Sequence, residues 1–114
     1  MRVLKELLEA IILFFVCVLA IAYLNYNNLS LSLAFLFITI LIFLKWHTKE
    51  DVAYYLTAFI IGPIGESLTI YYGAWYYTNP TLFGLPIWAP MAWGAAVTII
   101  RRISMIVLNF TRKD

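Results

Sequence analysis

The stretch LLEAIILFFVCVLAIAYL, residues 7–24, decides the class of this protein. Nearly all of its 18 residues are apolar, and as a helix it would extend for about 27 Å, close to the thickness of a lipid hydrocarbon core. Of all 114 residues, 64% are hydrophobic and only 12% are charged. A small soluble domain cannot bury such a share of apolar side chains, because its surface is large relative to its core. We therefore expect an integral membrane protein surrounded by the lipid bilayer.

Three further apolar stretches follow, and with the first they predict an all-α, integral membrane four-helix bundle. They cover residues 29–44, 52–72 and about 86–100. Gly62 and Pro63 interrupt the third stretch, so we expect a broken third helix. Residues 103–110 either lengthen the fourth helix or lie along the membrane surface. The whole chain, residues 1–114, is expected to form a single transmembrane domain.

The basic residues predict how the bundle is oriented. With four spans, both termini and the charged segment at 45–51 lie on the same side of the membrane. All eight lysines and arginines fall on that side, at positions 2, 5, 45, 49, 101, 102, 112 and 113. Because lysine and arginine are retained in cytoplasmic loops, we expect a multi-pass protein of the cell (inner) membrane with both termini in the cytoplasm.

The candidate site lies in the second half of the chain, since all five glycines and all four prolines fall between Gly62 and Gly94. Glu66 lies well inside the third predicted span, where a charge costs about 2.5–3.5 kcal/mol on insertion scales. The group would stay protonated or find a partner, and the hydroxyls of nearby Thr69, Tyr71 and Tyr72 are candidates. Both a functional acid and a packing acid hydrogen-bonded across helices remain open.

An uncharged aromatic link follows the third span, and turns are expected at Asn79-Pro80, Gly84 and Pro86. Folded back over Glu66, this link would form an aromatic cavity with a carboxyl group at its base, which suits a lipophilic ligand. The alternative is an interfacial aromatic belt that anchors the hairpin. The candidate ligand-binding residues are Glu66, Thr69, Tyr71, Tyr72, Trp75, Trp88 and Trp93.

Small residues recur at spacings of three or four in the last two spans, where they allow helices to approach closely. They are Ala58, Gly62, Gly65, Thr69 and Gly73, followed by Ala89, Ala92 and Ala96. We favour packing of the two helices within one chain, and a homodimer is the alternative. The turn at 25–28 contains three asparagines, which we interpret as turn-forming residues.

The composition argues against several kinds of partner. Cys17 is the single cysteine and His47 the single histidine, so no metal site is expected. A net charge of +2 with no long basic run gives no reason to expect nucleic acid as a partner. The sequence has no nucleotide-binding loop or nucleophile triad, and we predict no cofactor and assign no catalytic residue.

Two partial resemblances bear on function. The second half contains the pattern Glu66-x4-Tyr71-x-Gly73-x-Trp75-x-Tyr77-x2-Pro80-x3-Gly84-x-Pro86-x3-Pro90-x2-Trp93. It resembles a stretch of membrane carotenoid-biosynthesis proteins of the bacterioruberin hydratase type, over about a quarter of the chain. That resemblance implies acid-assisted addition of water to long polyenes, with Glu66 as the acid. In length, span number and a membrane glutamate the chain also resembles small multidrug-resistance exporters, whose glutamate lies in the first helix and exchanges protons for hydrophobic cations.

Three functions therefore remain open. The first is binding or transport of a lipophilic or cationic ligand at Glu66 and the aromatic link, which predicts loss of binding in Glu66→Gln. The second is an accessory or assembly subunit that packs against a larger membrane-protein partner. The third, ranked last, is an enzyme on an isoprenoid-like substrate with Glu66 as general acid.

Overall fold

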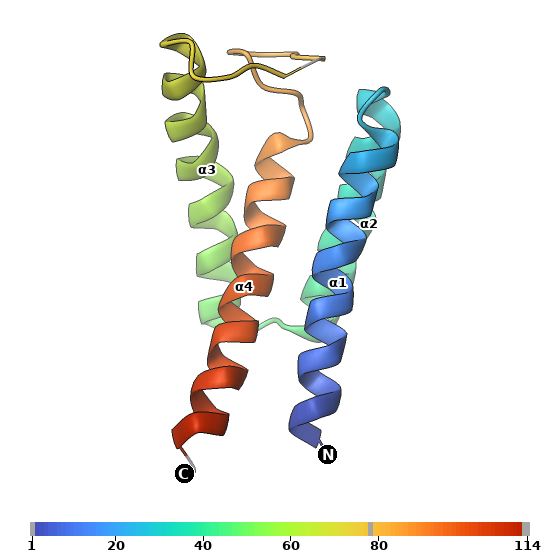
Figure 1. Ribbon diagram of the computed structural model, residues 1–114, viewed down its shortest axis with the longest axis vertical. Coiled ribbons are helices and arrows are strands. Elements are labelled where there is room, and N and C mark those ends of the chain that lie inside the picture. Colours follow the sequence, from blue (N-terminus) through green and yellow to red (C-terminus); the bar gives the residue numbers. More distant parts are fainter. Residues whose placement is uncertain (1, 78, 113–114) are drawn as a thin grey trace.

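The residues described by the computed structural model, 2–77 and 79–112, form a bundle of four helices (Figure 1). The helices are α1 (Arg2–Leu24), α2 (Asn28–Lys45), α3 (Lys49–Tyr71) and α4 (Ala89–Arg112). They run side by side along the long axis, and the start of α1 and the end of α4 lie at the same end of the bundle (Figure 1). The predicted all-α architecture with four helices is confirmed.

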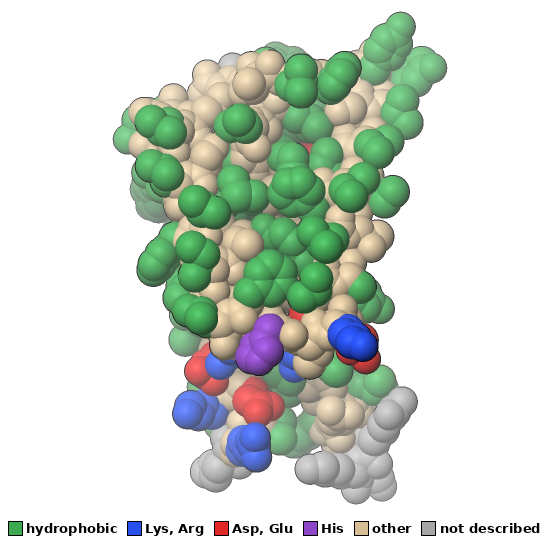
Figure 2. All heavy atoms as spheres, turned by 180° about the vertical axis from the view of Figure 1, so that it is seen from behind, with side chains coloured by type: hydrophobic (Ala, Val, Ile, Leu, Met, Phe, Trp, Pro, Cys, Tyr) green, Lys and Arg blue, Asp and Glu red, His purple; other side chains and the backbone are tan. Residues whose placement is uncertain are grey.

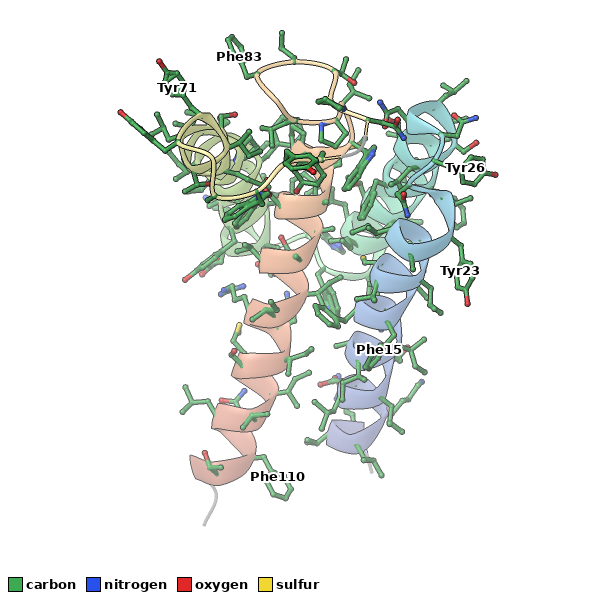
Figure 3. The ribbon with its side chains drawn as sticks, turned by 45° about the horizontal axis from the view of Figure 1, so that its top comes forward. Phe15, Tyr23, Tyr26, Tyr71, Phe83 and Phe110 are labelled. Atoms are coloured by element: carbon green, nitrogen blue, oxygen red, sulfur yellow. The ribbon has the colours of Figure 1, made fainter. Side chains whose placement is uncertain are left out.

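The surface of the bundle is compatible with a lipid environment. Within the described ranges, α1, α2 and α4 are long and apolar enough to cross a membrane. The helix α3, which contains the predicted span at 52–72, does not meet the same criterion, so that span stays a prediction. Hydrophobic side chains cover the middle of the bundle and charged ones gather at one end (Figure 2). Large aromatic side chains point outward and are 57–78% exposed (Figure 3): Phe15, Tyr23, Tyr26, Tyr71, Phe83 and Phe110. Apolar exposure on this scale is unusual for a soluble monomer.

Local capping explains where the helices begin and end. The side chain of Asn27 accepts a hydrogen bond from the Ser30 backbone N–H and starts α2. Thr48 and Asp51 form a reciprocal capping box at the start of α3. Gly73, with φ +85°, follows the end of α3 and donates its N–H to the Ile70 carbonyl.

The predicted break in the third helix is not confirmed, because α3 continues as one helix through Pro63. Proline removes the hydrogen bond to the Phe59 carbonyl, but the turns on both sides stay helical and α4 packs alongside. At the other end of the chain, residues 103–110 belong to α4 and lengthen it. Of the two arrangements left open from the sequence, the structure has the longer helix.

The closest helix packing joins α3 and α4 through two glycines, each covered by an aromatic ring of the other helix. A Cβ atom added to Gly62 of α3 would lie 2.3 Å from Cδ2 of Trp93. A Cβ atom added to Gly94 of α4 would lie 2.8 Å from Cε1 of Tyr55. By contrast, no atom lies within 4 Å of a Cβ added to Gly65. Of the glycines in the predicted small-residue pattern, Gly62 thus allows close packing within the chain and Gly65 does not contribute, whereas Gly94 was not part of that pattern.

Gly62→Ala is expected to lower the free energy of unfolding by about 1–3 kcal/mol, because the new methyl group overlaps the Trp93 ring. Gly65→Ala makes the same change one turn further along α3 without a clash, and is expected to be neutral or to stabilise by up to about 1 kcal/mol. Loss of helical circular dichroism during titration of micelles with a denaturing detergent measures both. Equal destabilisation by the two variants would contradict this packing.

Candidate functional site

Glu66 connects three parts of the fold through its carboxyl group. It is 9% exposed and lies on the side of α3 that faces α4. Its Oε1 accepts a hydrogen bond of 2.8 Å from Nε1 of Trp93 on α4. Its Oε2 accepts one of 2.5 Å from the hydroxyl of Tyr77, in the link between α3 and α4. Because both oxygens have a donor from another element, Glu66 holds the link and α4 against α3.

The protonated state of Tyr77 follows from its surroundings. Burial raises the pKa of this hydroxyl, and the neighbouring Glu66 raises it further. The hydroxyl therefore keeps its proton and serves as a donor. The link residue Tyr77 is thus a contact of Glu66 that the sequence analysis did not select, because it lies 11 positions away in an irregular segment.

The other candidate residues are spread over different surroundings. Thr69 donates its hydroxyl to the Glu66 backbone carbonyl at 2.8 Å rather than to the carboxyl group. Tyr71 and Tyr72 are 77% and 83% exposed and do not bond the carboxyl group. The partners expected from the sequence are therefore corrected to the Tyr77 hydroxyl and the Trp93 indole N–H. Trp75 is 47% exposed, and Trp88 is buried against Phe35 and Tyr77.

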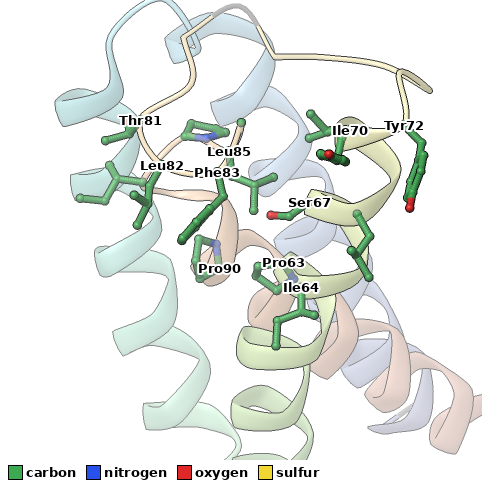
Figure 4. Close-up of a pocket in the computed structure, with 15 residues that line it drawn as sticks. Pro63, Ile64, Ser67, Ile70, Tyr72, Thr81, Leu82, Phe83, Leu85 and Pro90 are labelled. Atoms are coloured by element: carbon green, nitrogen blue, oxygen red, sulfur yellow. The ribbon is translucent and has the colours of Figure 1, made fainter.

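A large apolar cavity, open to the outside along one side, lies between α3, the link and the start of α4 (Figure 4). Its volume is about 890 Å³, and apolar side chains form almost all of its wall. Ser67 from α3 and Phe83 from the link lie on opposite sides of it (Figure 4). Tyr71 and Tyr72 also line this apolar cavity, whereas Glu66 does not. The aromatic link therefore does form a cavity wall, but the carboxyl group is not at its base.

The link forms an ordered turn at the cavity wall. Thr81 donates its N–H to the Leu85 carbonyl at 2.7 Å, and Leu85 donates to the Leu82 carbonyl at 2.9 Å. Phe83 and Gly84 both have positive φ, 53° and 81°, as a type I′ turn requires. A non-glycine residue rarely adopts this conformation, and here the backbone hydrogen bonds between Leu82 and Leu85 close the turn around the exposed Phe83.

A second, smaller cavity lies on the other side of the link, beside the α1–α2 turn. This polar pocket has a volume of about 190 Å³. It is lined by Ile21, Asn25, Asn28, Tyr76, Tyr77, Asn79, Pro86 and Trp88. Nδ2 of Asn28 donates to the Asn79 carbonyl at 2.9 Å, and Nδ2 of Asn79 donates to the Asn25 carbonyl at 2.9 Å. The asparagines that we interpreted as turn-forming residues therefore also fasten the α1–α2 turn to the link.

The opposite end of the bundle is held by a buried acid. Asp51 is fully buried, and its Oδ1 accepts hydrogen bonds from Nη1 of Arg101 at 3.1 Å and from Nε of Arg102 at 2.9 Å. Its Oδ2 makes a second contact with Arg102, through Nη2. The Arg101 guanidinium also lies over the Tyr54 ring. Burial raises the pKa of Asp51, but hydrogen bonds from Arg102 and Thr48 outweigh it and lower the pKa to about 2. Asp51 is thus a structural ion-pair centre that the sequence analysis placed only in a charged segment.

No protein-family model, curated protein or solved structure matches this chain. The fold and its cavities define a small all-helical protein with a lipid-compatible surface, an apolar cavity and a polar pocket. The chemistry of these two cavities is therefore the basis for assigning a function.

Proposed function

We propose that this is a multi-pass protein of the cell (inner) membrane that binds a lipophilic ligand in the apolar cavity. The observation that carries the proposal is the cavity itself, an open groove of about 890 Å³ with almost wholly apolar walls. Small-molecule sites typically measure about 300–1,000 Å³ and are lined mainly by hydrophobic side chains. A hydrocarbon chain would fill this space without leaving a polar group unpaired.

The distribution of charge supports the orientation that accompanies this proposal. Arg2, Lys45 and Arg101 make their ion pairs at the end of the bundle that carries both chain ends, and the cavity lies toward the other end. Lysine and arginine favour the cytoplasmic side of a membrane. The charged end would then lie in the cytoplasm, and the cavity would lie in the outer half of the membrane.

The contacts of Glu66 favour an uncharged ligand over a cation. Its two carboxyl oxygens already accept hydrogen bonds from Tyr77 and Trp93, and it does not line the apolar cavity. Glu66 is therefore a positioning residue that fixes the link, and the geometry supports binding better than acid catalysis. Long polyene chains, which the resemblance to bacterioruberin hydratase-type proteins implies, belong to the proposed class of ligand.

Ser67→Phe is expected to weaken binding of a lipophilic probe at least about tenfold, because the new ring occupies the cavity opposite Phe83. The probe is parinaric acid methyl ester, a fluorescent polyene, added to the protein in nanodiscs of saturated phosphatidylcholine. Energy transfer from the protein's tryptophans to the polyene reports binding.

Thr57→Phe is the matched control, since it adds the same ring to an exposed position of α3 that does not line the cavity. Binding should be unchanged in this variant. If the probe does not bind the unmodified protein, or binds equally well to Ser67→Phe, the proposed function is wrong. Either result would favour the accessory-subunit hypothesis.

A further inference from the structure

Two buried polar atoms at the polar pocket have no hydrogen-bond partner within residues 2–77 and 79–112. They are Oδ1 of Asn28, an acceptor, and Nε1 of Trp88, a donor, and both residues line the pocket. Trp88 is 4% exposed, so water outside the protein cannot readily reach its indole N–H. A buried donor or acceptor without a partner costs about 1–3 kcal/mol, and native structures rarely leave one unpaired. An occupant that both accepts and donates, as a hydroxyl group does, would satisfy both atoms.

The walls of the polar pocket define the chemistry of this occupant further. The Nδ2 atoms of Asn25, Asn28 and Asn79 already donate hydrogen bonds within the protein, so these side chains offer their Oδ1 atoms as acceptors. The rings of Tyr76, Tyr77 and Trp88 supply apolar faces. None of the residues that line the pocket is charged, so neither a phosphate nor an ammonium group would find a counter-charge there. A volume of about 190 Å³ exceeds the space of a single water molecule several times. The pocket therefore suits a compact, uncharged group that carries hydroxyls.

The polar pocket adjoins the apolar cavity. Pro86 lines both of them. Thr81, which lines the apolar cavity, accepts a hydrogen bond of 3.1 Å from Nδ2 of Asn28, which lines the polar pocket. A single molecule with its chain in one and its head group in the other would lie across the link at Pro86.

We propose that the ligand is an uncharged amphiphile, whose hydroxyl-bearing head group, such as a sugar or glycerol, occupies the polar pocket while its hydrocarbon chain occupies the apolar cavity. This inference rests on the proposed function, because it assumes that the chain binds in the apolar cavity. It adds the head-group class and assigns Asn28 and Trp88 as the residues that recognise it.

The test compares two probes with the same parinaroyl chain, the glucose ester and the methyl ester. The glucose ester is expected to bind the unmodified protein more tightly. Trp88→Phe removes the unpaired indole N–H, and it should weaken the glucose ester about tenfold while changing the methyl ester by less than about twofold. Trp46→Phe is the matched control at a buried tryptophan that lines neither cavity, and should change neither affinity.

The outcomes separate this inference from the proposed function. If Ser67→Phe weakens both probes but Trp88→Phe spares the preference for glucose, the pocket holds water only and the head-group inference is wrong, whereas lipophilic binding stands. If neither probe binds, both proposals are wrong. If Trp88→Phe does not fold, the unmodified protein is tested with a probe that carries a phosphate head group on the same chain. Weaker binding of this probe than of the glucose ester supports an uncharged head-group site, and equal affinity would overturn it.

Discussion

Asp51→Asn is expected to lower the free energy of unfolding by about 3 kcal/mol, the lower end of the range for breaking a buried ion pair. Asparagine keeps the shape of the side chain and an oxygen that can accept from Thr48, so the helix cap remains. The negative charge between Arg101 and Arg102 is lost, and these side chains are only 17% and 22% exposed. Titration of micelles with a denaturing detergent, followed by circular dichroism, measures the change.

Glu6→Gln is the control for this prediction. Glu6 pairs with Arg2 at 3.4 Å, but the Arg2 side chain is 91% exposed, so the pair is screened by solvent and its loss should change stability little. Equal loss in Asp51→Asn and Glu6→Gln would contradict a structural role for the buried cluster.

Acid provides a second measurement of the same ion pair. The pKa of Asp51 is lowered from 3.8 to about 2, so the folded state binds its proton less readily than the unfolded state does. The stabilisation is therefore complete above about pH 4 and is lost as the pH falls through the folded pKa near 2. The free energy of unfolding of the unmodified protein should fall more steeply in this pH interval than that of Asp51→Asn. Parallel curves of stability against pH for the two proteins would argue against the ion pair.

The helices could be predicted from the sequence because each depends on local signals. The apolar stretch at 7–24 lies within α1, and residues 25–27 of the predicted turn separate it from α2, which begins at Asn28. The break expected at Gly62 and Pro63 is absent because tertiary contacts decide there: the Trp93 ring packs on Gly62 and the helix runs on beneath it. Local propensity alone overstates the effect of such residues inside a bundle.

The candidate site was only partly predictable, for a related reason. Glu66 could be selected because an acid in an apolar stretch must be accommodated. Its partners could not, since Tyr77 and Trp93 lie 11 and 27 positions away and meet it only when the link and α4 fold against α3. The pairing of Asn28 with Asn79, 51 positions apart, has the same origin.

Glu66→Leu is expected to have the second largest effect, because it leaves the Tyr77 hydroxyl and the Trp93 indole N–H without an acceptor. Each unpaired donor costs about 1–3 kcal/mol where it stays buried. The link would also lose its attachment to α3, so amide hydrogen exchange around Tyr77 should become faster and binding of the parinaroyl probes weaker. Stability by detergent titration and exchange by mass spectrometry measure the two effects.

Glu66→Gln distinguishes a positioning residue from a charged binding site. The amide oxygen of glutamine can accept from Trp93, while its NH₂ group donates to the Tyr77 hydroxyl, which can turn to accept. We therefore expect Glu66→Gln to retain most of the stability and probe binding that Glu66→Leu loses, contrary to the loss expected if Glu66 held a cation. Trp93→Phe should destabilise the unmodified protein but partly rescue Glu66→Leu, because it removes a donor that has no acceptor there. If glutamine is as damaging as leucine, the negative charge itself is required, and a ligand-binding role for Glu66 must replace the positioning role.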